Sequence, residues 1–219
     1  MINGFLRFLL IMTLPGAVWG GNFQIGGETG FNSGVSVKTN VLFRNIAKDF
    51  PFMLRAGVGY TALNPGNSAE ARRIFINNAT NGTPEKRGWL WDMRLDFLYP
   101  VKWFSLKRGY FYAGPRFSKF TGNFNYVGGN ENFDVTSNAW GFGGGLESHF
   151  PMTKRFDFIL SAGLDYYATR RLQGHDTSYS PDGETINGRE DYTYENADNA
   201  INQPKLTPHI SLGINFFFK

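Results

Sequence analysis

The sequence contains no cysteine, and beyond residue 20 it contains no long apolar run. The absence of cysteine excludes a fold that depends on disulfides, and the absence of apolar runs excludes a helical membrane protein. The basic residues give a formal net charge of +4 but lie scattered along the chain. They form no motif that binds nucleic acid, so we expect no nucleic-acid partner. The chain is instead rich in glycine and phenylalanine, with 27 and 22 residues, a composition that favours strands and turns.

Residues 1–20 have the pattern of a secretory signal peptide. Arg7 precedes an apolar stretch at residues 8–14, and the segment ends at Val18-Trp19-Gly20. The stretch is too short for a membrane helix, and a polar, glycine-rich segment follows it directly. We therefore predict export, with a signal peptide at 1–20 and a single domain at 21–219 that is long enough for a sandwich or a barrel.

The end of the chain alternates between an apolar and a polar face. The apolar positions are Leu206, Pro208, Ile210, Leu212, Ile214, Phe216 and Phe218. A period of two indicates a β-strand with one apolar side. Seven other segments alternate in the same way, at residues 23–31, 35–43, 52–60, 89–99, 111–117, 140–150 and 156–166. We predict an all-β fold, an eight-stranded antiparallel up-and-down transmembrane β-barrel, because an even number of strands can close without leaving an unpaired edge in lipid.

The connections between these segments alternate in length. Short turns are predicted at residues 45–49, 101–107 and 152–154, and long loops at residues 64–86, 122–136 and 171–204. The short side repeats an aromatic-proline pair at strand ends, in Phe50-Pro51, Tyr99-Pro100 and Phe150-Pro151. The exception is residues 31–35, predicted as a tight hairpin with Gly34 in the left-handed conformation. Short turns facing the periplasm and long loops outside are typical of small outer-membrane barrels.

Aromatic residues gather near both ends of the predicted strands. Phe43 and Phe97 lie near the short turns, and Tyr60, Trp91 and Trp140 lie near the long loops. Two aromatic girdles are expected at the two membrane interfaces. The alternative is a soluble barrel or sandwich, in which the apolar face would point inward. That alternative explains neither the girdles nor the aromatic end of the chain.

The inward faces carry charged residues that we expect to pair across neighbouring strands. The predicted proximities are Glu28 with Lys38, Arg55 with Asp96, Asp92 with Arg116, and His149 with Asp157. Buried charges cost several kcal/mol unless they are paired, and eight strands enclose room for side chains but hardly for a channel. The predicted lumen ion-pair network comprises Glu28, Lys38, Arg55, Asp92, Arg94, Asp96, Arg116, Glu147, His149 and Asp157. We interpret it as a satisfied polar core, with a gated ion path as the alternative.

Two further interpretations remain open at this stage. His209 and Ser211 lie two apart on the inward face of the last strand, and with Asp165 or Glu28 they are the residue types of a Ser-His-acid set. A lipid-modifying enzyme is therefore an alternative, although no family motif supports it. The acidic loop 171–204 is a candidate for calcium binding, but it lacks the ordered Asp-x-Asp-x-Asp-Gly spacing. We predict no cofactor, no catalytic residue and no metal site.

The alternation, the loop asymmetry and the ending Gly213-x-x-Phe216-x-Phe218 resemble the OmpA/OmpX and opacity-protein type of eight-stranded outer-membrane barrel. The resemblance covers nearly the whole chain after residue 20 and implies that a lipid-facing terminal signature serves assembly: Leu212, Ile214, Phe216 and Phe218. Lys219, which follows the last phenylalanine, departs from that pattern.

The resemblance implies a non-enzymatic surface protein in the outer membrane of a Gram-negative-type bacterium. Such proteins often serve envelope integrity, adhesion or evasion, and the fold does not select among these roles. The implied partners are outer-membrane lipid and lipopolysaccharide, the barrel-assembly machinery and an extracellular ligand of the long loops.

Overall fold

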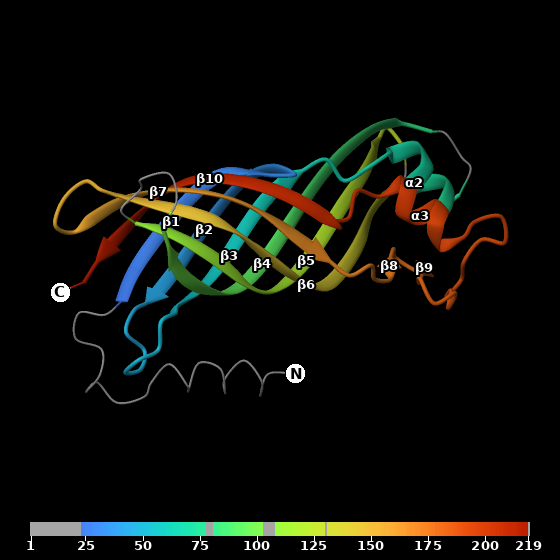
Figure 1. Ribbon diagram of the computed structural model, residues 1–219. Helices are drawn as coiled ribbons and strands as arrows, with labels where there is room; N and C mark the ends of the chain where they lie inside the picture. Colours follow the sequence, from blue (N-terminus) through green and yellow to red (C-terminus); the bar gives the residue numbers. More distant parts are fainter. Residues whose placement is uncertain (1–22, 78–80, 103–107, 130, 219) are drawn as a thin grey trace, which may run out of the picture.

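Eight long antiparallel strands form a closed barrel (Figure 1). The structure is a computed structural model that describes residues 23–77, 81–102, 108–129 and 131–218. Each long strand pairs with the next one along the chain, and pairing between the first and the last closes the ring. The strands are β1 (Phe23–Asn32), β2 (Gly34–Phe43), β3 (Met53–Leu63), β4 (Thr83–Val101), β5 (Gly109–Val127), β6 (Asn132–Pro151), β7 (Phe156–Tyr167) and β10 (Leu206–Phe217). The predicted fold class is confirmed, whereas the predicted signal peptide lies outside the described residues.

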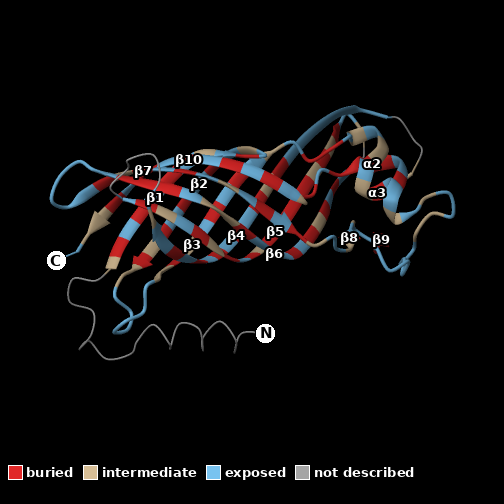
Figure 2. Ribbon diagram, in the orientation of Figure 1, coloured by how far each residue is buried: buried red, intermediate tan, exposed pale blue. Residues whose placement is uncertain are grey.

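Buried and exposed residues alternate along the strands of the barrel (Figure 2), and large apolar residues are exposed whereas many charged residues are buried. Val35, Trp140 and Phe142 are 69%, 61% and 59% exposed, whereas Asp96 and Arg116 are 0% exposed. An apolar outer surface around a polar interior is suited to lipid and not to water. The soluble alternative, which needs the opposite arrangement, is therefore excluded.

Strands β4, β5 and β6 project beyond their neighbours at the end opposite the short turns (Figure 1). Pairing between β5 and β6 continues without a break from Gly109↔Ser148 to Asn125↔Asn132. The predicted long loop at 122–136 is thus wrong, because most of it is paired strand. A strand was predicted only where apolar side chains occupied the outward positions. In this projection the apolar side chains occupy the inward positions, so a loop was predicted in place of the strand.

The change of face occurs at one level of the barrel wall. Phe117 and Trp140 oppose one another and point outward, and in the next outward row Lys119 opposes Asn138. Above that row the inward residues are apolar and buried, including Phe124 on β5. The register between β5 and β6 is unbroken, so no β-bulge moves the side chains from one face to the other. The apolar residues instead change from outward to inward positions because the surroundings of the outer face change. The outer face meets lipid below this level and water above it.

The remaining loops fold into a cap over the projecting strands. The cap contains α2 (Ser68–Phe75), β8 (Leu172–Gln173), β9 (Ser178–Tyr179) and α3 (Tyr194–Ala200), and Figure 1 shows both helices at this end of the barrel. Asn67 caps α2 through its side chain, and Thr193 and Asn196 form a capping box on α3. The apolar faces of these elements and of β4 to β6 share one core: Ala71, Ile74, Phe75, Leu90, Phe120, Phe124, Tyr126, Phe133, Val135, Leu172, Tyr179, Ala197, Ala200 and Ile201.

Polar contacts within the cap join segments that are far apart in the sequence. The Tyr179 hydroxyl donates to the Ile74 carbonyl at 3.0 Å and accepts from the Arg189 amide at 3.1 Å. Burial in the cap raises the pKa of the Tyr179 phenol. Arg72 forms an ion pair with Glu131 at 2.6 Å, which ties α2 to the tip of the β5–β6 hairpin. The predicted long loops at 64–86 and 171–204 are therefore largely folded segments.

The tight hairpin between β1 and β2 is present, but its left-handed residue is Ser33, with a φ of 57°. Gly34 serves a different purpose, because a Cβ at that position would lie 2.1 Å from the Ala62 carbonyl oxygen. The glycine allows β2 and β3 to approach closely. The prediction for Gly34 was right about the turn and wrong about the residue that takes the positive φ.

None of the helices in the described ranges is long and apolar enough to span a bilayer.

Candidate functional site: the charged lumen

A chain of buried ion pairs crosses the interior of the barrel. Arg55 on β3 binds Asp96 on β4 at 3.0 Å and also pairs with Glu147 on β6. Arg116 on β5 binds Asp96 at 2.7 Å and Asp165 on β7 at 2.8 Å. Two strands, β4 and β5, separate β3 from β6, so the pair between Arg55 and Glu147 crosses the lumen. The pair between Arg116 and Asp165 instead follows the wall, because it passes over Gly143 of β6, the strand between β5 and β7.

Asp165 connects this chain to a second group of residues. Arg94 on β4 lies 2.6 Å from Asp92 and 3.4 Å from Asp165. His209 on β10 lies 3.4 Å from Asp165 through Nδ1, and its Nε2 forms a hydrogen bond of 2.7 Å with the Tyr112 hydroxyl. Asp165 thus faces two guanidinium groups and an imidazole, more basic partners than any other described carboxylate of the network has.

The chain continues toward the short-turn end of the barrel. Glu147 pairs with His149, whose Nδ1 lies 3.8 Å from Asp157. Asp157 in turn binds Arg108 at 3.1 Å, and the Arg108 side chain is 44% exposed. The network therefore extends from the middle of the lumen to a solvent-exposed arginine at the rim.

Glu28 and Lys38 illustrate the difference between strand register and side-chain contact. They are direct partners in the β1–β2 register, as the sequence suggested. The Glu28 carboxylate accepts hydrogen bonds from Ser211 at 2.7 Å and Asn40 at 3.0 Å, and lies 3.9 Å from Arg55. Lys38 is buried but, within the described part of the chain, has no carboxylate oxygen closer than 4.0 Å. The structure does not form the ion pair expected between these two residues.

The structure also corrects the expected proximity of Asp92 and Arg116. Asp92 opposes Ser118, and Arg116 opposes Arg94, so the predicted register is displaced by two residues. Asp92 pairs with Arg94 on its own strand, and Arg116 takes Asp96 and Asp165 instead. By contrast, Arg55 and Asp96 are direct register partners and are in contact.

Sequence reasoning missed three members of the network. Asp165 was considered only as a partner of His209, and Arg108 and Tyr112 were not considered. The Arg55 guanidinium lies 4.9 Å from the centre of the Tyr112 ring, a cation–π distance. The inward position of Asp165 and Tyr112 in the period-two pattern was the available signal, whereas contacts across the lumen leave no trace in sequence spacing.

Glycine makes room for these side chains on the inward wall. A Cβ at Gly143 would lie 1.8 Å from the Asp165 carboxylate, and one at Gly59 would lie 2.2 Å from the Asp92 carboxylate. The two carboxylates therefore lie directly against the backbone of the neighbouring strand, because each glycine is the register partner of its aspartate. Any larger residue at these positions would displace the groups that bind the arginines.

Apolar side chains flank the middle of the charged network on both sides. Toward the short turns lies a cluster of Leu42, Leu98 and Tyr112, with Met53 and Tyr110 packed against it. Toward the other end lies the core of the cap, which includes the inward residues Leu90 and Phe120. The ion pairs from Arg55 to Asp165 thus lie between two apolar layers, where their interactions are screened less than at a surface, whereas His149, Asp157 and Arg108 continue the network toward the rim.

The geometry does not assemble the Ser-His-acid set considered from the sequence. Ser211 donates to Glu28, and Nε2 of His209 is bound to Tyr112, so the histidine makes no hydrogen bond with the serine. Nor do the described residues contain a group of three or more histidine, cysteine or acidic side chains placed to hold a metal ion. The acidic residues of 171–204 are dispersed over the cap, where Asp198 pairs with Lys205 and Glu184 with Arg171.

The terminal strand presents its apolar residues outward. Leu212 and Ile214 are about half exposed. Phe216 lies 5.0 Å from Phe156 between ring centres, and Phe218 stacks on Phe23 at 4.6 Å. These rings join the two ends of the described chain at the short-turn side of the barrel, where a girdle was predicted.

No protein-family model and no curated protein sequence matches this chain. Among solved structures, it is similar to a major outer membrane protein from Thermus thermophilus, with 21% identity, a TM-score of 0.73 and coverage of 91% of this chain and 100% of that one. The N-terminal β-barrel domain of Pseudomonas aeruginosa OprF matches with 14% identity, a TM-score of 0.41 and coverage of 91% and 98%. Neisserial surface protein A matches with 16% identity, a TM-score of 0.37 and coverage of 90% and 95%. The likeness to the Thermus protein shows that this chain has the fold of an outer-membrane β-barrel.

Proposed function

We propose that the chain is a non-enzymatic surface protein of the outer membrane, whose closed barrel anchors a folded extracellular cap. The observation that carries this proposal is the chain of buried ion pairs inside the barrel from Arg55 through Asp96 and Arg116 to Asp165. These side chains are at most 5% exposed and lie between two apolar layers. An ion entering the lumen would have to displace paired charges from a site where they are poorly screened, which costs several kcal/mol.

The cap supports a role in contacts outside the cell. It is held by its own apolar core, so its surface is presented in a fixed shape and not as mobile loops. A fixed surface binds a partner without the entropy cost of ordering loops first. We propose that this surface contacts an extracellular ligand or neighbouring envelope components, in line with a role in envelope integrity or adhesion.

Planar-bilayer recording tests the closed-barrel part of the proposal. The purified protein is expected to give no stable unitary conductance in 1 M KCl, while a known porin reconstituted in the same way gives clear steps. Reproducible steps from the native protein would favour the second candidate, a narrow pore. The observation that favours this candidate is the continuity of the network from Asp165 to the exposed Arg108.

Comparison of cells that express the native chain or Ser211→Ala tests the non-enzymatic part. We expect the same lipid A profile in both, because Ser211 is hydrogen-bonded to Glu28 and not to a histidine. A modified lipid A species that appears only with the native chain would contradict the proposal.

A further inference from the structure

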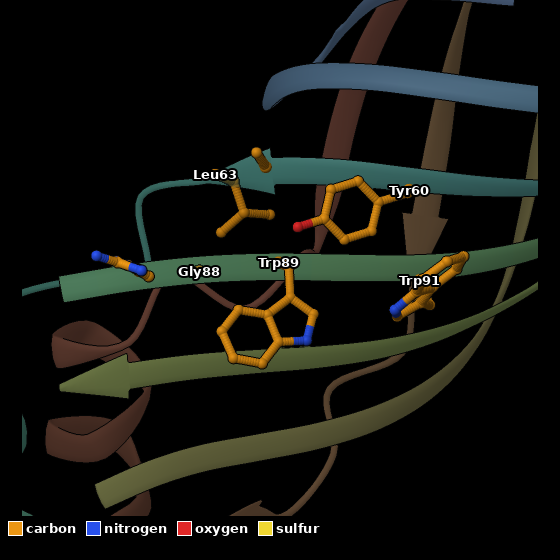
Figure 3. A pocket seen from close by; sticks show the side chains of 7 residues that line it. Tyr60, Leu63, Gly88, Trp89 and Trp91 are labelled. Atoms are coloured by element: carbon orange, nitrogen blue, oxygen red, sulfur yellow. The ribbon is translucent and has the colours of Figure 1, made fainter. Parts of the chain in front are cut away.

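The outer face of β3 and β4 contains an aromatic-lined hollow with a volume of about 570 Å³ (Figure 3). Tyr60 opposes Trp91, and Ala62 opposes Trp89, so β3 places one large and one small side chain opposite two tryptophans of β4. The Tyr60 and Trp91 rings meet edge to face with their centres 5.1 Å apart. Figure 3 shows Tyr60, Leu63, Trp89 and Trp91 around the same space. The alanine leaves the hollow between the large rings, which we call the aromatic groove.

The aromatic groove lies where the outer surface changes from apolar to polar. On the short-turn side of the groove, outward-facing Val58 and Met93 are exposed apolar residues. On the other side β3 ends at Leu63, and β4 continues outward with the exposed residues Arg87 and Glu85. Tryptophan and tyrosine favour the level of lipid headgroups, because their rings have an apolar body and a polar tip. The groove therefore lies at the interface of the outer leaflet.

Two basic side chains flank the aromatic groove. Arg87 lines it, and Lys119 on β5 directly opposes Trp91. Both residues are exposed, and neither forms an ion pair within the described part of the protein. Nearby Lys86 is engaged differently, because its ammonium donates to the Gly66 carbonyl at 2.6 Å. Arg87 and Lys119 thus provide two free positive charges beside an apolar slot.

We propose that the aromatic groove binds an anionic lipid of the outer leaflet, whose headgroup carries a phosphate and no cationic group. An acyl chain would lie against Tyr60 and Trp91, and the phosphate would be held by Arg87 and Lys119. The charge complementarity supports an anionic headgroup, since guanidinium groups bind phosphate oxygens well. The inference rests on the membrane placement of the barrel in the proposed function, and it names a lipid partner and the residues that would select it.

Fluorescence quenching by brominated lipids tests the groove directly. A variant that keeps only Trp89 and Trp91 is prepared in detergent micelles, with Trp19, Trp103 and Trp140 changed to phenylalanine. Dibrominated phosphatidylglycerol is expected to quench this variant at saturable, lower concentrations than dibrominated phosphatidylcholine, by about fivefold or more. Arg87→Gln with Lys119→Gln should raise the half-saturating concentration of phosphatidylglycerol to that of phosphatidylcholine, without changing the latter.

Two controls separate this site from general lipid contact. Lys154→Gln with Arg155→Gln removes two exposed charges at a short turn and should leave the preference intact. A tryptophan-free chain carrying Ile210→Trp, on the outer face of β10, should show no preference between the two lipids. Equal quenching of Trp89 and Trp91 by both lipids overturns the proposal, as does full displacement of the brominated lipid by millimolar inorganic phosphate.

The quenching assay and the bilayer recording have independent outcomes. A conducting barrel that still prefers phosphatidylglycerol would reject only the closed-barrel function. A silent barrel without lipid preference would reject only the lipid site.

Discussion

At the scale of single residues, each buried charge in the lumen needs its partner, although the ion pairs themselves add little to the free energy of unfolding. Taking an ion out of water costs several kcal/mol, and a well-placed partner only offsets that cost. Arg116 neutralises Asp96 and Asp165 together, and its own side chain is fully buried. Removing such a residue leaves two carboxylates in a closed interior with one partner fewer each.

We therefore predict that Arg116→Ala lowers the free energy of unfolding by about 3–5 kcal/mol. Urea unfolding in detergent micelles, followed by tryptophan fluorescence and by the heat-modifiable mobility of the folded barrel, measures the change. Arg73→Ala is the matched control, because it breaks the exposed pair with Glu70 and should cost no more than about 1 kcal/mol. Equal unfolding midpoints for the two variants would contradict the role assigned to Arg116.

The inward or outward direction of most lumen residues could be predicted from the sequence, but their partners could not. A period of two fixes the face on which Asp92 or Arg116 lies, because successive side chains alternate across a strand. Which carboxylate an arginine reaches depends on strand register and on the width of the lumen. Arg55 with Asp96 was accessible because they are register partners. Arg116 with Asp165 was not, because the contact crosses from β5 to β7.

The β1–β2 hairpin allows a second residue-scale prediction. Ser33 has a left-handed backbone, which glycine adopts at lower cost. Ser33→Gly should therefore stabilise the barrel slightly, by about 0.5–1 kcal/mol, in the same unfolding assay. Gly34→Ser is the matched change at the next position and should destabilise, since its Cβ would clash with the Ala62 carbonyl. A Gly34→Ser variant at least as stable as Ser33→Gly would be contrary to the observed turn.

At the scale of elements, the inversion of polarity along β5 and β6 marks the outer boundary of the lipid-facing surface. Phe117 is outward and apolar, whereas Phe120 and Phe124, at the opposite parity, are inward and buried. The shift of the apolar residues from odd to even positions of β5 is visible in the sequence. It would have predicted a projecting β-hairpin in place of a loop. The cap was not predictable in the same way, because its core joins two long connections with the ends of β4, β5 and β6, and these segments share no local pattern.

The cap should be able to open without unfolding the barrel, because its core is separate from the lumen network. Phe75 on α2 packs edge to face on Tyr179 with ring centres 5.5 Å apart. Phe75→Ala would leave a cavity in this core and cost about 3–5 kcal/mol. We predict faster tryptic cleavage at Arg171 and Arg189, while the heat-modifiable gel mobility of the barrel is retained.

Ile186→Ala provides the control for this experiment. Ile186 lies in the same long connection between β7 and β10 but is 53% exposed, so its truncation should leave the cleavage rate close to that of the native protein. Loss of the folded barrel in Phe75→Ala would refute the independence of the cap. An unchanged cleavage rate would mean that Phe75 does not hold it closed.

At the scale of the whole molecule, different parts of one chain are in contact with two solvents, lipid and water. Lipid surrounds the outward face of the closed ring, water surrounds the projecting strands, and the interior holds paired charges flanked by two apolar clusters. The closed ring removes free strand edges, as lipid requires. Closure depends on the pairing of β1 with β10, which come from opposite ends of the described chain.

This closure gives the final prediction, on assembly in the cell. Phe218 stacks on Phe23, so the aromatic end of the chain lies at the seam between the first and last strands. If the terminal aromatic signature is read during assembly, Phe218→Ala should reduce the folded protein in the outer membrane several-fold, whereas refolding of the purified chain in detergent should change little. Leu206→Ala, at the other end of the same strand and also exposed, should affect neither. Quantitative gel-shift analysis of outer-membrane fractions measures the folded protein. An equal loss in cells and in detergent would assign Phe218 to stability and not to recognition by the assembly machinery.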